Sequence, residues 1–300
     1  MASDNYKIGI DLGGTKIEII LLDKSGTELF RKRIKTPQNS YSLTLELISK
    51  LVFEAEKLIN FDATVGIGIP GKLSQKNELI EYANSTYLIG KPLISDLENL
   101  LNRKINVQND ANCFTLSEYT DGAGKNVDSL FGVILGSGVG GGIVINDRLH
   151  EGLNLNSGEW GHNQMPWSSE LELKSNPCYC GRLGCIETFL SGKGFQKTFF
   201  NITNKNISPE KIVELVDQED EFAIQAMELY ELRLAKSLSI VINLLDPDMI
   251  VLGGGLSNIN RIYDKVPILL DEYVLSDSIS TQIIKAVHGD SSGVRGAAWL

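Results

Sequence analysis

One pattern occurs twice in this chain and strongly limits what it can fold into: a buried strand, a glycine-rich turn and a second strand. It covers residues 9–23 (GIDLGGTKIEIILLD) and residues 132–147 (GVILGSGVGGGIVIND), and both copies end in an acidic or amide turn. The identity between the copies is slight, but the shared order of elements predicts a duplicated α/β unit. With 300 residues, the chain is long enough for about two domains.

Strands and helices are predicted along the rest of the chain as well. Helical spacing of apolar residues predicts helices over 41–60, 92–102, 111–119, 208–217, 220–245, 257–273 and 293–300. Short apolar or alternating runs predict strands over 28–34, 64–71, 105–110, 248–255 and 281–287. Residues 136–142 (GSGVGGG) are predicted to form a loop, and residues 148–186 are predicted to be rich in loops.

The charge balance excludes some classes of partner. The chain has 28 Lys and Arg against 38 Asp and Glu, a net charge of -10. A surface this acidic repels the phosphates of nucleic acids and anionic membranes, so neither is an expected partner. No stretch is long and apolar enough for a membrane span, and the N-terminus does not resemble a signal peptide. The expected location is therefore the cytoplasm.

Three glycine-rich turns follow apolar strands, at Gly13–Thr15, Gly136–Gly142 and Gly253–Gly255. The second matches G-x-G-x-x-G, but a dinucleotide-binding loop opens a helix, and the residues here continue as a strand. Glycines let backbone N–H groups approach phosphate closely, so the three turns together favour a nucleotide site. Ordinary tight turns remain the alternative for each one singly.

Two aspartates lie at strand ends, where open α/β folds place their ligands. Asp11 ends the first buried strand, and its carboxylate is costly to bury unless it faces a cleft or a cation. It is therefore a candidate to hold Mg²⁺ through water. The alternative is that it caps the turn. Asp110 follows a strand and opens a helix, which makes it either a helix cap or a functional carboxylate. Lys16 is interpreted as a solvated strand residue.

The densest group of reactive side chains lies between residues 158 and 187. Three of the four cysteines, Cys178, Cys180 and Cys185, fall within eight residues, with His162 upstream. Three thiols and an imidazole are a common donor set for tetrahedral structural zinc, and the glycines between the cysteines allow the backbone to fold around a metal. Buried thiols without metal are the alternative. Cys113, alone in a predicted helix, is interpreted as a core residue.

These motifs together resemble the ROK sugar kinases, which belong to the hexokinase, actin and Hsp70 superfamily. The resemblance runs from Tyr6 to Leu300 and rests on DLGGT (11–15), ND (109–110), LGSGVG (135–140), GEWGH (158–162), the cysteine cluster and VLGGG (251–255). The EWGHN, PW, CYCG and HGDSSGVRG segments are most similar to the bacterial fructokinase and mannokinase branch. The family implies an α/β protein of two ribonuclease H-like domains flanking an interdomain cleft.

The resemblance also implies roles for individual residues. Asp110 resembles the general base toward the sugar hydroxyl. The residues that correspond to sugar ligands are Asn84, Asn109, Asp110, Glu159, His162 and Glu187. Those that correspond to nucleotide contacts are Asp11, Gly13, Gly14, Thr15, Gly136, Ser137, Gly138, Gly254 and Gly255. Those that correspond to zinc ligands are His162, Cys178, Cys180 and Cys185.

The implied activity is ATP-dependent phosphorylation of a hexose. The branch leads us to expect D-fructose as the substrate and its 6-hydroxyl as the group that is phosphorylated. The implied metals are Mg²⁺, bound with ATP, and a structural Zn²⁺. The segment 163–177 is longer than in many glucokinases of the family, so mannose, glucose or an N-acetylhexosamine are alternative substrates. The expected domains are 1–109 with 289–300, and 110–288 with a zinc-binding insertion at about 158–187. The family also allows a homodimer.

Two non-enzymatic classes share this fold. ROK repressors carry an N-terminal helix-turn-helix, for which a first strand at Tyr6 leaves no room, and the acidic charge disfavours DNA. A catalytically inactive sugar sensor is the second alternative, and the presence of Asp110 and of the glycine turns argues against it.

Overall fold

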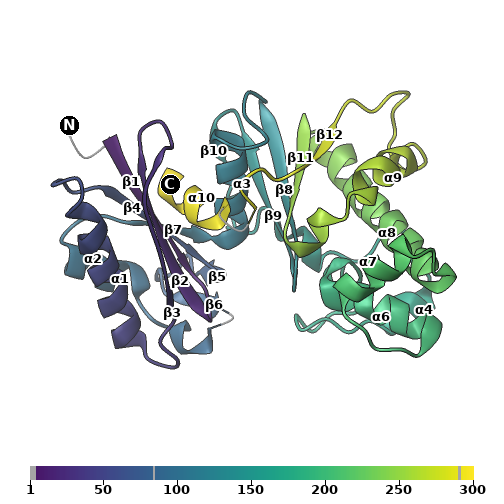
Figure 1. The fold of residues 1–300 in the computed structure, drawn as a ribbon, viewed down its shortest axis with the longest axis horizontal. Coiled ribbons are helices and arrows are strands. Elements are labelled where there is room, and N and C mark those ends of the chain that lie inside the picture. The colour runs from purple at the N-terminus through teal and green to yellow at the C-terminus, as the bar shows by residue number, and fades with distance from the viewer. Residues whose placement is uncertain (1–4, 84, 290–291) are drawn as a thin grey trace. The chain divides into compact units, whose positions relative to one another are not determined.

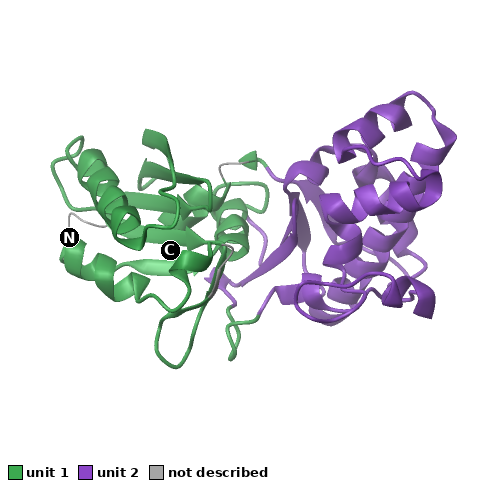
Figure 2. Ribbon diagram, turned by 90° about the horizontal axis from the view of Figure 1, so that it is seen from below, with its two compact units in different colours: residues 1–125, 151–156, 287–300 green, residues 126–150, 157–286 purple. Residues whose placement is uncertain are grey.

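The computed structural model describes residues 5–83, 85–289 and 292–300, and the chain divides into two compact units (Figure 2). The first unit comprises 1–125, 151–156 and 287–300, and the second comprises 126–150 and 157–286. The expected boundary at 109/110 lies too early, because the helix that starts at Asp110 belongs to the first unit. The backbone of Cys113 in that helix packs so tightly on Gly296 that a Cβ at 296 would lie 1.6 Å from the Cys113 carbonyl oxygen.

The first unit is built on a five-stranded sheet of order β3-β2-β1-β4-β7. The strands are β1 (Tyr6–Leu12), β2 (Lys16–Asp23), β3 (Glu28–Lys35), β4 (Thr64–Ile69) and β7 (Asn106–Asn109). β1, β2 and β3 pair antiparallel, whereas β1, β4 and β7 pair parallel. A small hairpin of β5 (Gly71–Leu73) and β6 (Ile80–Ala83) and a 3-10 turn, η2 (Thr86–Leu88), follow β4.

Helices cover both faces of this sheet (Figure 1). On one side lie α1 (Tyr41–Glu56) and α2 (Leu93–Leu101), and on the other lie α3 (Asp110–Thr120) and α10 (Ser292–Trp299). α10 can approach the strands closely because β1 and β4 present glycine to it. A Cβ at Gly9 would lie 2.0 Å from the Val294 carbonyl oxygen, and one at Gly66 would lie 1.9 Å from that of Ala297.

The second unit repeats this plan with a sheet of order β10-β9-β8-β11-β12. Its strands are β8 (Ser129–Leu135), β9 (Val139–Ile145), β10 (Arg148–Leu149), β11 (Met249–Gly253) and β12 (Gln282–Lys285). Again the first three in sequence pair antiparallel and the last two extend the sheet in parallel. The matching order and sense of pairing confirm the predicted duplication and the expected α/β fold of two ribonuclease H-like domains.

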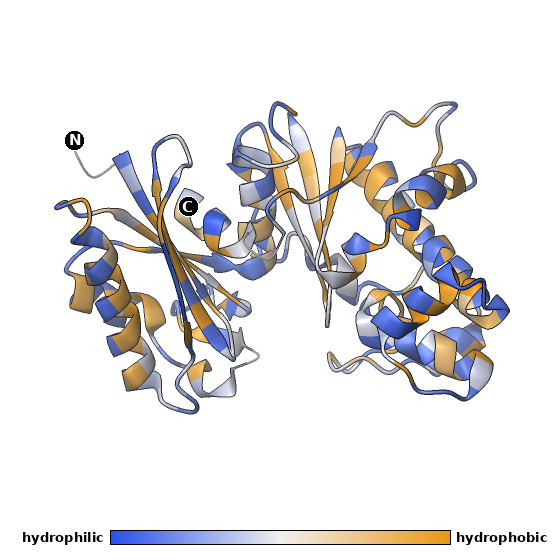
Figure 3. Ribbon diagram, in the orientation of Figure 1, coloured by the Kyte–Doolittle hydropathy of each residue, from blue (hydrophilic) through white to orange (hydrophobic). Residues whose placement is uncertain are grey.

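The helical layer of the second unit packs on the sheet through apolar side chains. In Figure 3 many residues along these strands and helices are coloured as hydrophobic. Its elements are η3 (Glu159–His162), α4 (Glu170–Lys174), α5 (Glu187–Leu190), α6 (Gly192–Thr203), α7 (Pro209–Asp217), α8 (Glu221–Leu245), η4 (Gly255–Asn258) and α9 (Arg261–Leu270). The long α8 contributes buried Tyr230, Leu234 and Leu238 to this core. None of the helices in the described part of the chain is long and apolar enough to cross a membrane.

Three details differ from the sequence-based expectation. The loop predicted over 136–142 is wrong in its second half, because β9 starts at Val139 and Gly140–Gly142 pair with β8. The helix predicted over 257–273 is two elements, η4 and α9. The helix α6 was not predicted, because Gly192 and Gly194 interrupt its helical pattern. The structure explains the second glycine, since a side chain at position 194 would collide with the Phe189 backbone.

Candidate functional site

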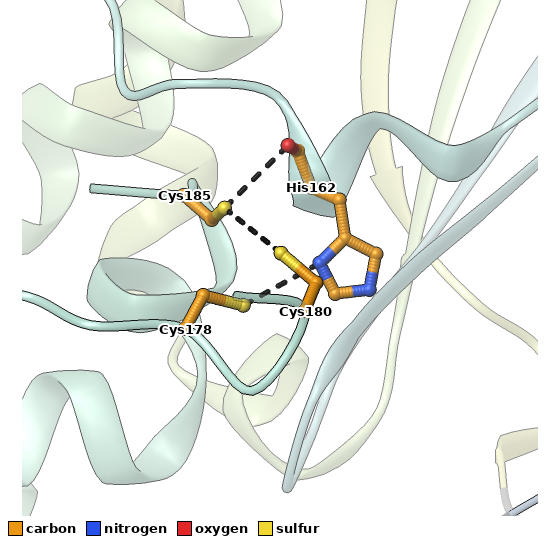
Figure 4. Close-up of side chains that lie close together, drawn as sticks. All are labelled: His162, Cys178, Cys180 and Cys185. Atoms are coloured by element: carbon orange, nitrogen blue, oxygen red, sulfur yellow. Dashed lines mark hydrogen bonds between the residues drawn. The ribbon is translucent and has the colours of Figure 1, made fainter. Parts of the chain in front are cut away.

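The predicted metal ligands of the second unit lie together. The imidazole of His162 and the thiols of Cys178, Cys180 and Cys185 offer ligand atoms that all lie within 4.8 Å of one another (Figure 4). The Cys178 Sγ is 3.6 Å from His162 Nδ1, and the Cys180 and Cys185 sulfurs are also 3.6 Å apart. Around a tetrahedral zinc with ordinary Zn–S and Zn–N bonds, neighbouring ligand atoms lie about 3.5–3.8 Å apart, so this set fits zinc.

Two glycines shape the cysteine loop around these ligands. Gly181 and Gly184 have φ angles of +86° and +69°, which side chains other than glycine rarely adopt. The Cys178 N–H donates to the Arg182 carbonyl, and the Gly184 N–H donates to that of Asn176, which closes the loop. Both positions therefore have the backbone conformations for which glycine is needed, as the sequence-based interpretation of this loop requires.

The thiols differ in how readily they ionise. Burial raises the pKa of Cys178 and, more strongly, that of Cys185. Burial opposes ionisation of Cys180 as well, but a backbone hydrogen bond at Arg182 and the neighbouring thiols outweigh it and lower the pKa of Cys180. Metal ligation requires thiolates, and of the three thiols Cys180 has the surroundings that most favour this form.

The turn that carries His162 is packed directly on β9. Trp160 is buried and its indole N–H donates to the Gly140 carbonyl over 3.0 Å. A Cβ at Gly141 would lie 2.8 Å from the Trp160 ring, and one at Gly161 would lie 2.3 Å from the Val139 carbonyl oxygen. A glycine on each side of this contact, Gly141 in β9 and Gly161 in η3, is therefore needed for close packing, which anchors His162 to the sheet.

His162 presents its two ring nitrogens to different partners. Nδ1 faces the thiols, whereas Nε2 lies 3.0 Å from the Tyr179 hydroxyl. The resemblance gives His162 two roles, as a metal ligand and as a sugar ligand: Nδ1 is placed for the first, whereas Nε2, the nitrogen left for a sugar, is paired with Tyr179 here. The sequence analysis did not identify Tyr179 as a partner of His162. The available signal was the position of Tyr179 between the predicted ligands Cys178 and Cys180.

The two glutamates that flank the metal ligands have different surroundings. Glu159 is exposed at the start of η3. Glu187 starts α5, and its carboxylate accepts the Val139 N–H over 3.0 Å. A Cβ at Gly138 would lie 2.7 Å from the same carboxylate, so Glu187 connects the metal loop to the glycine turn of the first β-hairpin of this unit.

The segment 163–177 packs onto the helices of the second unit. The Glu172 carboxylate pairs with Arg233 over 2.9 Å, and the Arg233 guanidinium lies over the Phe189 ring. The Trp167 ring lies 5.0 Å from that of Tyr273. The long insertion is therefore an ordered part of the unit that carries the metal ligands.

A cavity of about 620 Å³ opens beside the predicted nucleotide contacts of the second unit. Gly136, Ser137 and Gly255 line it, as expected from the glycine turns. The rest of its wall was not predicted and consists of Gly192, Lys193, Gln196, Pro209, Glu210, Val213, Glu214, Leu256, Asn258 and Ile259. These residues come from α6, α7 and η4, so only the folded chain brings them together. The wall combines apolar side chains with polar and charged ones, and such a mixture suits a ligand that has both an apolar ring and hydrogen-bonding groups.

Backbone hydrogen bonds hold the glycine turns around this cavity. The Gly192 N–H at the start of α6 donates to the Gly136 carbonyl over 2.8 Å, and the Gly136 N–H donates to that of Gly138. Gly254 has a φ of +82°, and a Cβ there would lie 2.5 Å from the Leu135 carbonyl oxygen. The turns after β8 and β11 thus contact each other through residues that have to be glycine.

The first unit holds the remaining predicted nucleotide contacts, Asp11, Gly13, Gly14 and Thr15, at the end of β1. Asp11 lies opposite Glu18 in the β1–β2 ladder. Burial, and then repulsion from Glu18, raises the pKa of Asp11 from 3.8 to about 6, although Lys16 and Arg33 oppose this. A carboxylate in such surroundings gains most from a nearby cation, so Asp11 fits a residue that holds Mg²⁺.

Asp11 should therefore destabilise the unliganded protein. The pKa of Asp11 in the folded protein lies above its ordinary value, so folding favours the protonated carboxyl group. The contribution of Asp11 to the free energy of unfolding is therefore most favourable below about pH 4 and is lost as the pH rises through about 6. We expect Asp11→Asn to raise the free energy of unfolding at pH 7.5 by as much as about 3 kcal/mol, and by less near pH 4. Urea titration measures this difference.

Asp23 supplies the matched control for that experiment. Its pKa is lowered by the Ser25 hydroxyl, so Asp23→Asn should give no gain in stability at pH 7.5. An Asp11→Asn variant no more stable than the wild type at this pH would contradict the assignment of a strained carboxylate to Asp11.

Asn109 and Asp110 lie where β7 meets α3. Asn109 is the residue that caps the helix, since its side chain accepts the N–H groups of Ala111 and Asn112. Asp110 is the first helical residue and its Oδ1 accepts the Ala111 N–H over 2.8 Å. Cys113 is fully buried as expected, and burial, with the charges of Asp110 and Asp11, raises the pKa of its thiol well above the ordinary value.

The predicted sugar ligands fall on both units. Asn109 and Asp110 belong to the first, and Glu159, His162 and Glu187 belong to the second. Asn84 lies outside the described residues. Within the first unit, the Asn109 amide donates to the Gly71 carbonyl over 3.2 Å, which ties the end of β7 to the hairpin that follows β4.

Comparisons with known proteins agree with the family resemblance. The ROK family model matches residues 7–300. The N-acetyl-D-glucosamine kinase of Histophilus somni is 37% identical over 297 residues, which cover 97% of each chain. The narrower resemblance to fructokinases and mannokinases is not confirmed, because the similar curated proteins that we compared are N-acetyl-D-glucosamine kinases.

Solved structures share the fold over nearly the whole length. A ROK hexokinase from Thermus thermophilus superposes with a TM-score of 0.87 at 24% identity, covering 98% of this chain and 96% of that one. A ROK family glucokinase from Streptomyces griseus, solved in complex with glucose and AMPPNP, gives a TM-score of 0.77 at 26% identity and covers 98% of both chains. The chain therefore belongs to the ROK family, the family that its motifs predict.

Proposed function

We propose that the protein is an ATP-dependent hexose kinase that phosphorylates the 6-hydroxyl of N-acetyl-D-glucosamine. The observation that carries the substrate is the 37% identity to an N-acetyl-D-glucosamine kinase along 97% of the chain. The geometry supports the reaction, because a glycine turn follows the central strand of each sheet and a carboxylate stands at the end of β7. Fructose, expected from the narrower resemblance, becomes the alternative substrate.

Asp110 is proposed as the general base. Phosphoryl transfer passes through a loose transition state, so most of the catalysis comes from positioning and charge stabilisation. The attacking hydroxyl becomes acidic late in the reaction, when an aspartate with an ordinary pKa can take its proton. The hydrogen bond from the Ala111 N–H holds the carboxylate in place for this step.

The nucleotide is proposed to contact both glycine-rich ends. The cavity beside Gly136, Ser137 and Gly255 suits the base and ribose, and the glycine turns of the two units suit the phosphates. Mg²⁺, when bound with ATP, would neutralise charge on the β- and γ-phosphates, and Asp11 is the residue proposed to hold it. Zn²⁺ is assigned a structural role, because four protein ligands leave no open position.

Substrate choice is tested by kcat/KM for N-acetyl-D-glucosamine, N-acetyl-D-mannosamine, glucose, mannose and fructose in a coupled assay. We expect N-acetyl-D-glucosamine to lead glucose by at least about tenfold, because a pocket built for the acetamido group is left unfilled by a hydroxyl. A lead for fructose would restore the fructokinase assignment and contradict the one proposed here.

The same assay separates a kinase from a sugar sensor. ATP consumption that depends on added sugar identifies the kinase, whereas sugar binding without turnover identifies a sensor. Calorimetry with N-acetyl-D-glucosamine supplies the binding measurement, so that lack of turnover is not mistaken for lack of binding.

A further inference from the structure

The short segment that follows β3 contacts the glycine turn after β1. The Thr36 hydroxyl donates to the Gly13 carbonyl over 2.7 Å, and the Thr36 N–H donates to the Thr15 carbonyl over 3.0 Å. The side-chain amide of Gln38 donates to the Gly14 carbonyl over 3.3 Å. All three carbonyl groups of the turn are thus engaged by donors from residues 36–38.

Engaging the carbonyl groups also orients the N–H groups of the turn. In a trans peptide the C=O of one residue and the N–H of the next point in opposite directions, and the described part of the chain has no cis bonds. Fixing the Gly13 carbonyl therefore fixes the Gly14 N–H on the other side, and fixing the Gly14 carbonyl does the same for the Thr15 N–H. Neither N–H group has a hydrogen-bond partner among the described residues.

Thr36 is well suited to this task. It is only 3% exposed, so its hydroxyl has little access to solvent and its strong bond to Gly13 is well protected. Pro37 follows it, which restricts Thr36 to extended backbone and holds its N–H in one direction. Gln38 divides its amide between the Gly14 and Thr36 carbonyls at 3.3 Å each, so Thr36 makes the closer contacts.

We propose that Thr36 is a positioning residue for the triphosphate: through the Gly13 carbonyl it turns the Gly14 N–H toward the phosphate oxygens, and through the Thr15 carbonyl it holds the end of the turn in place. This inference rests on the proposed function for the identity of the nucleotide. It predicts a specific defect in nucleotide binding, since Thr36 is buried and both hydrogen bonds that it donates go to the turn.

The test compares Thr36→Val, which removes the hydroxyl at nearly constant volume, with Thr36→Ser, which keeps it. Calorimetry with AMPPNP and Mg²⁺ measures nucleotide affinity without turnover. We expect Thr36→Val to weaken this affinity by about tenfold and Thr36→Ser by no more than about twofold. In the kinase assay the KM for ATP should rise in the same order, and the KM for sugar should stay unchanged.

Thr44 provides the matched control. It is also fully buried in the first unit, and its hydroxyl donates to a backbone carbonyl, that of Ser40, over 2.8 Å. Thr44→Val should lose a comparable amount of stability in urea but keep its affinity for AMPPNP. Equal affinity losses in Thr36→Val and Thr44→Val, or none in Thr36→Val, would overturn the proposal. Wild-type protein that binds AMPPNP but phosphorylates no sugar would contradict the kinase assignment alone.

Discussion

Asp110→Asn is expected to lower kcat for sugar phosphorylation by about 10²- to 10⁴-fold, the usual range for losing a general base. Asparagine is nearly the same size and keeps an oxygen that can accept the Ala111 N–H, so the start of α3 should remain intact. What it cannot do is take the proton from the attacking hydroxyl. The affinity for sugar and the free energy of unfolding should therefore change little.

The measurement is kcat in the coupled assay, with sugar affinity by calorimetry and stability in urea as companions. Asp96→Asn is the control, since Asp96 lies in α2 of the same unit and accepts a hydrogen bond from the Tyr41 hydroxyl over 2.7 Å. It should keep nearly full activity. If Asp110→Asn kept more than about a tenth of the wild-type kcat, Asp110 would not be the base.

The elements next to the glycine turns could be predicted because their signals are local. β1, β2 and β8 are short, mostly apolar runs that lie next to a glycine-rich turn, and the two copies of this pattern predicted a duplicated α/β unit. The metal ligands are equally local, because three of the four lie within one short loop. Short-range sequence patterns were therefore enough to predict both the α/β fold class and the candidate metal site.

Features that depend on packing between distant segments could not be predicted. Gly140–Gly142 resemble a loop in the sequence, but they form a strand whose glycines make room for Trp160. The wall of the cavity combines α6, α7 and η4, which are far apart in the sequence, and α6 itself has a weak helical pattern. The boundary after 109 was wrong for the same reason: the contact of Cys113 with Gly296 joins residues near opposite ends of the chain.

The substrate illustrates a different limit. The motifs that carry the family resemblance are candidates to bind metal and phosphate, and neither they nor the segment 163–177 indicates which sugar the protein accepts. The narrower resemblance pointed to fructose, whereas the comparison along the whole chain favours N-acetyl-D-glucosamine. The proposed substrate therefore rests on similarity along the whole chain and not on the short motifs.

Removing the metal should weaken sugar binding strongly. His162 lies in η3 with its ring beside the three thiols, and Glu187 follows Cys185 by two residues, so we expect both proposed sugar ligands to depend on the metal for their position. We expect Cys180→Ser to lose zinc and to weaken affinity for N-acetyl-D-glucosamine by at least about tenfold, as loss of groups that support a metal site typically does. Elemental analysis of the wild type should find about one zinc per chain.

In Cys180→Ser the affinity for nucleotide should fall less than the affinity for sugar, but it should still fall to some extent. Glu187 accepts the Val139 N–H next to the Gly136–Gly138 turn, so this turn is not remote from the metal loop, whereas Gly254 and Gly255 lie on a separate loop after β11. Calorimetry with AMPPNP and with sugar on the same Cys180→Ser sample compares the two losses directly.

Leu183→Ala is the control for Cys180→Ser, because Leu183 lies in the same loop, is half exposed and offers no metal ligand. It should retain zinc and most of the sugar affinity. Wild-type protein stripped of zinc by a chelator should behave like Cys180→Ser and recover when zinc is returned, since the lost interactions are those that the metal orders. Full sugar affinity in the stripped protein would show that His162 and Glu187 keep their positions without the metal, and the proposed coupling between the two sites would then be wrong.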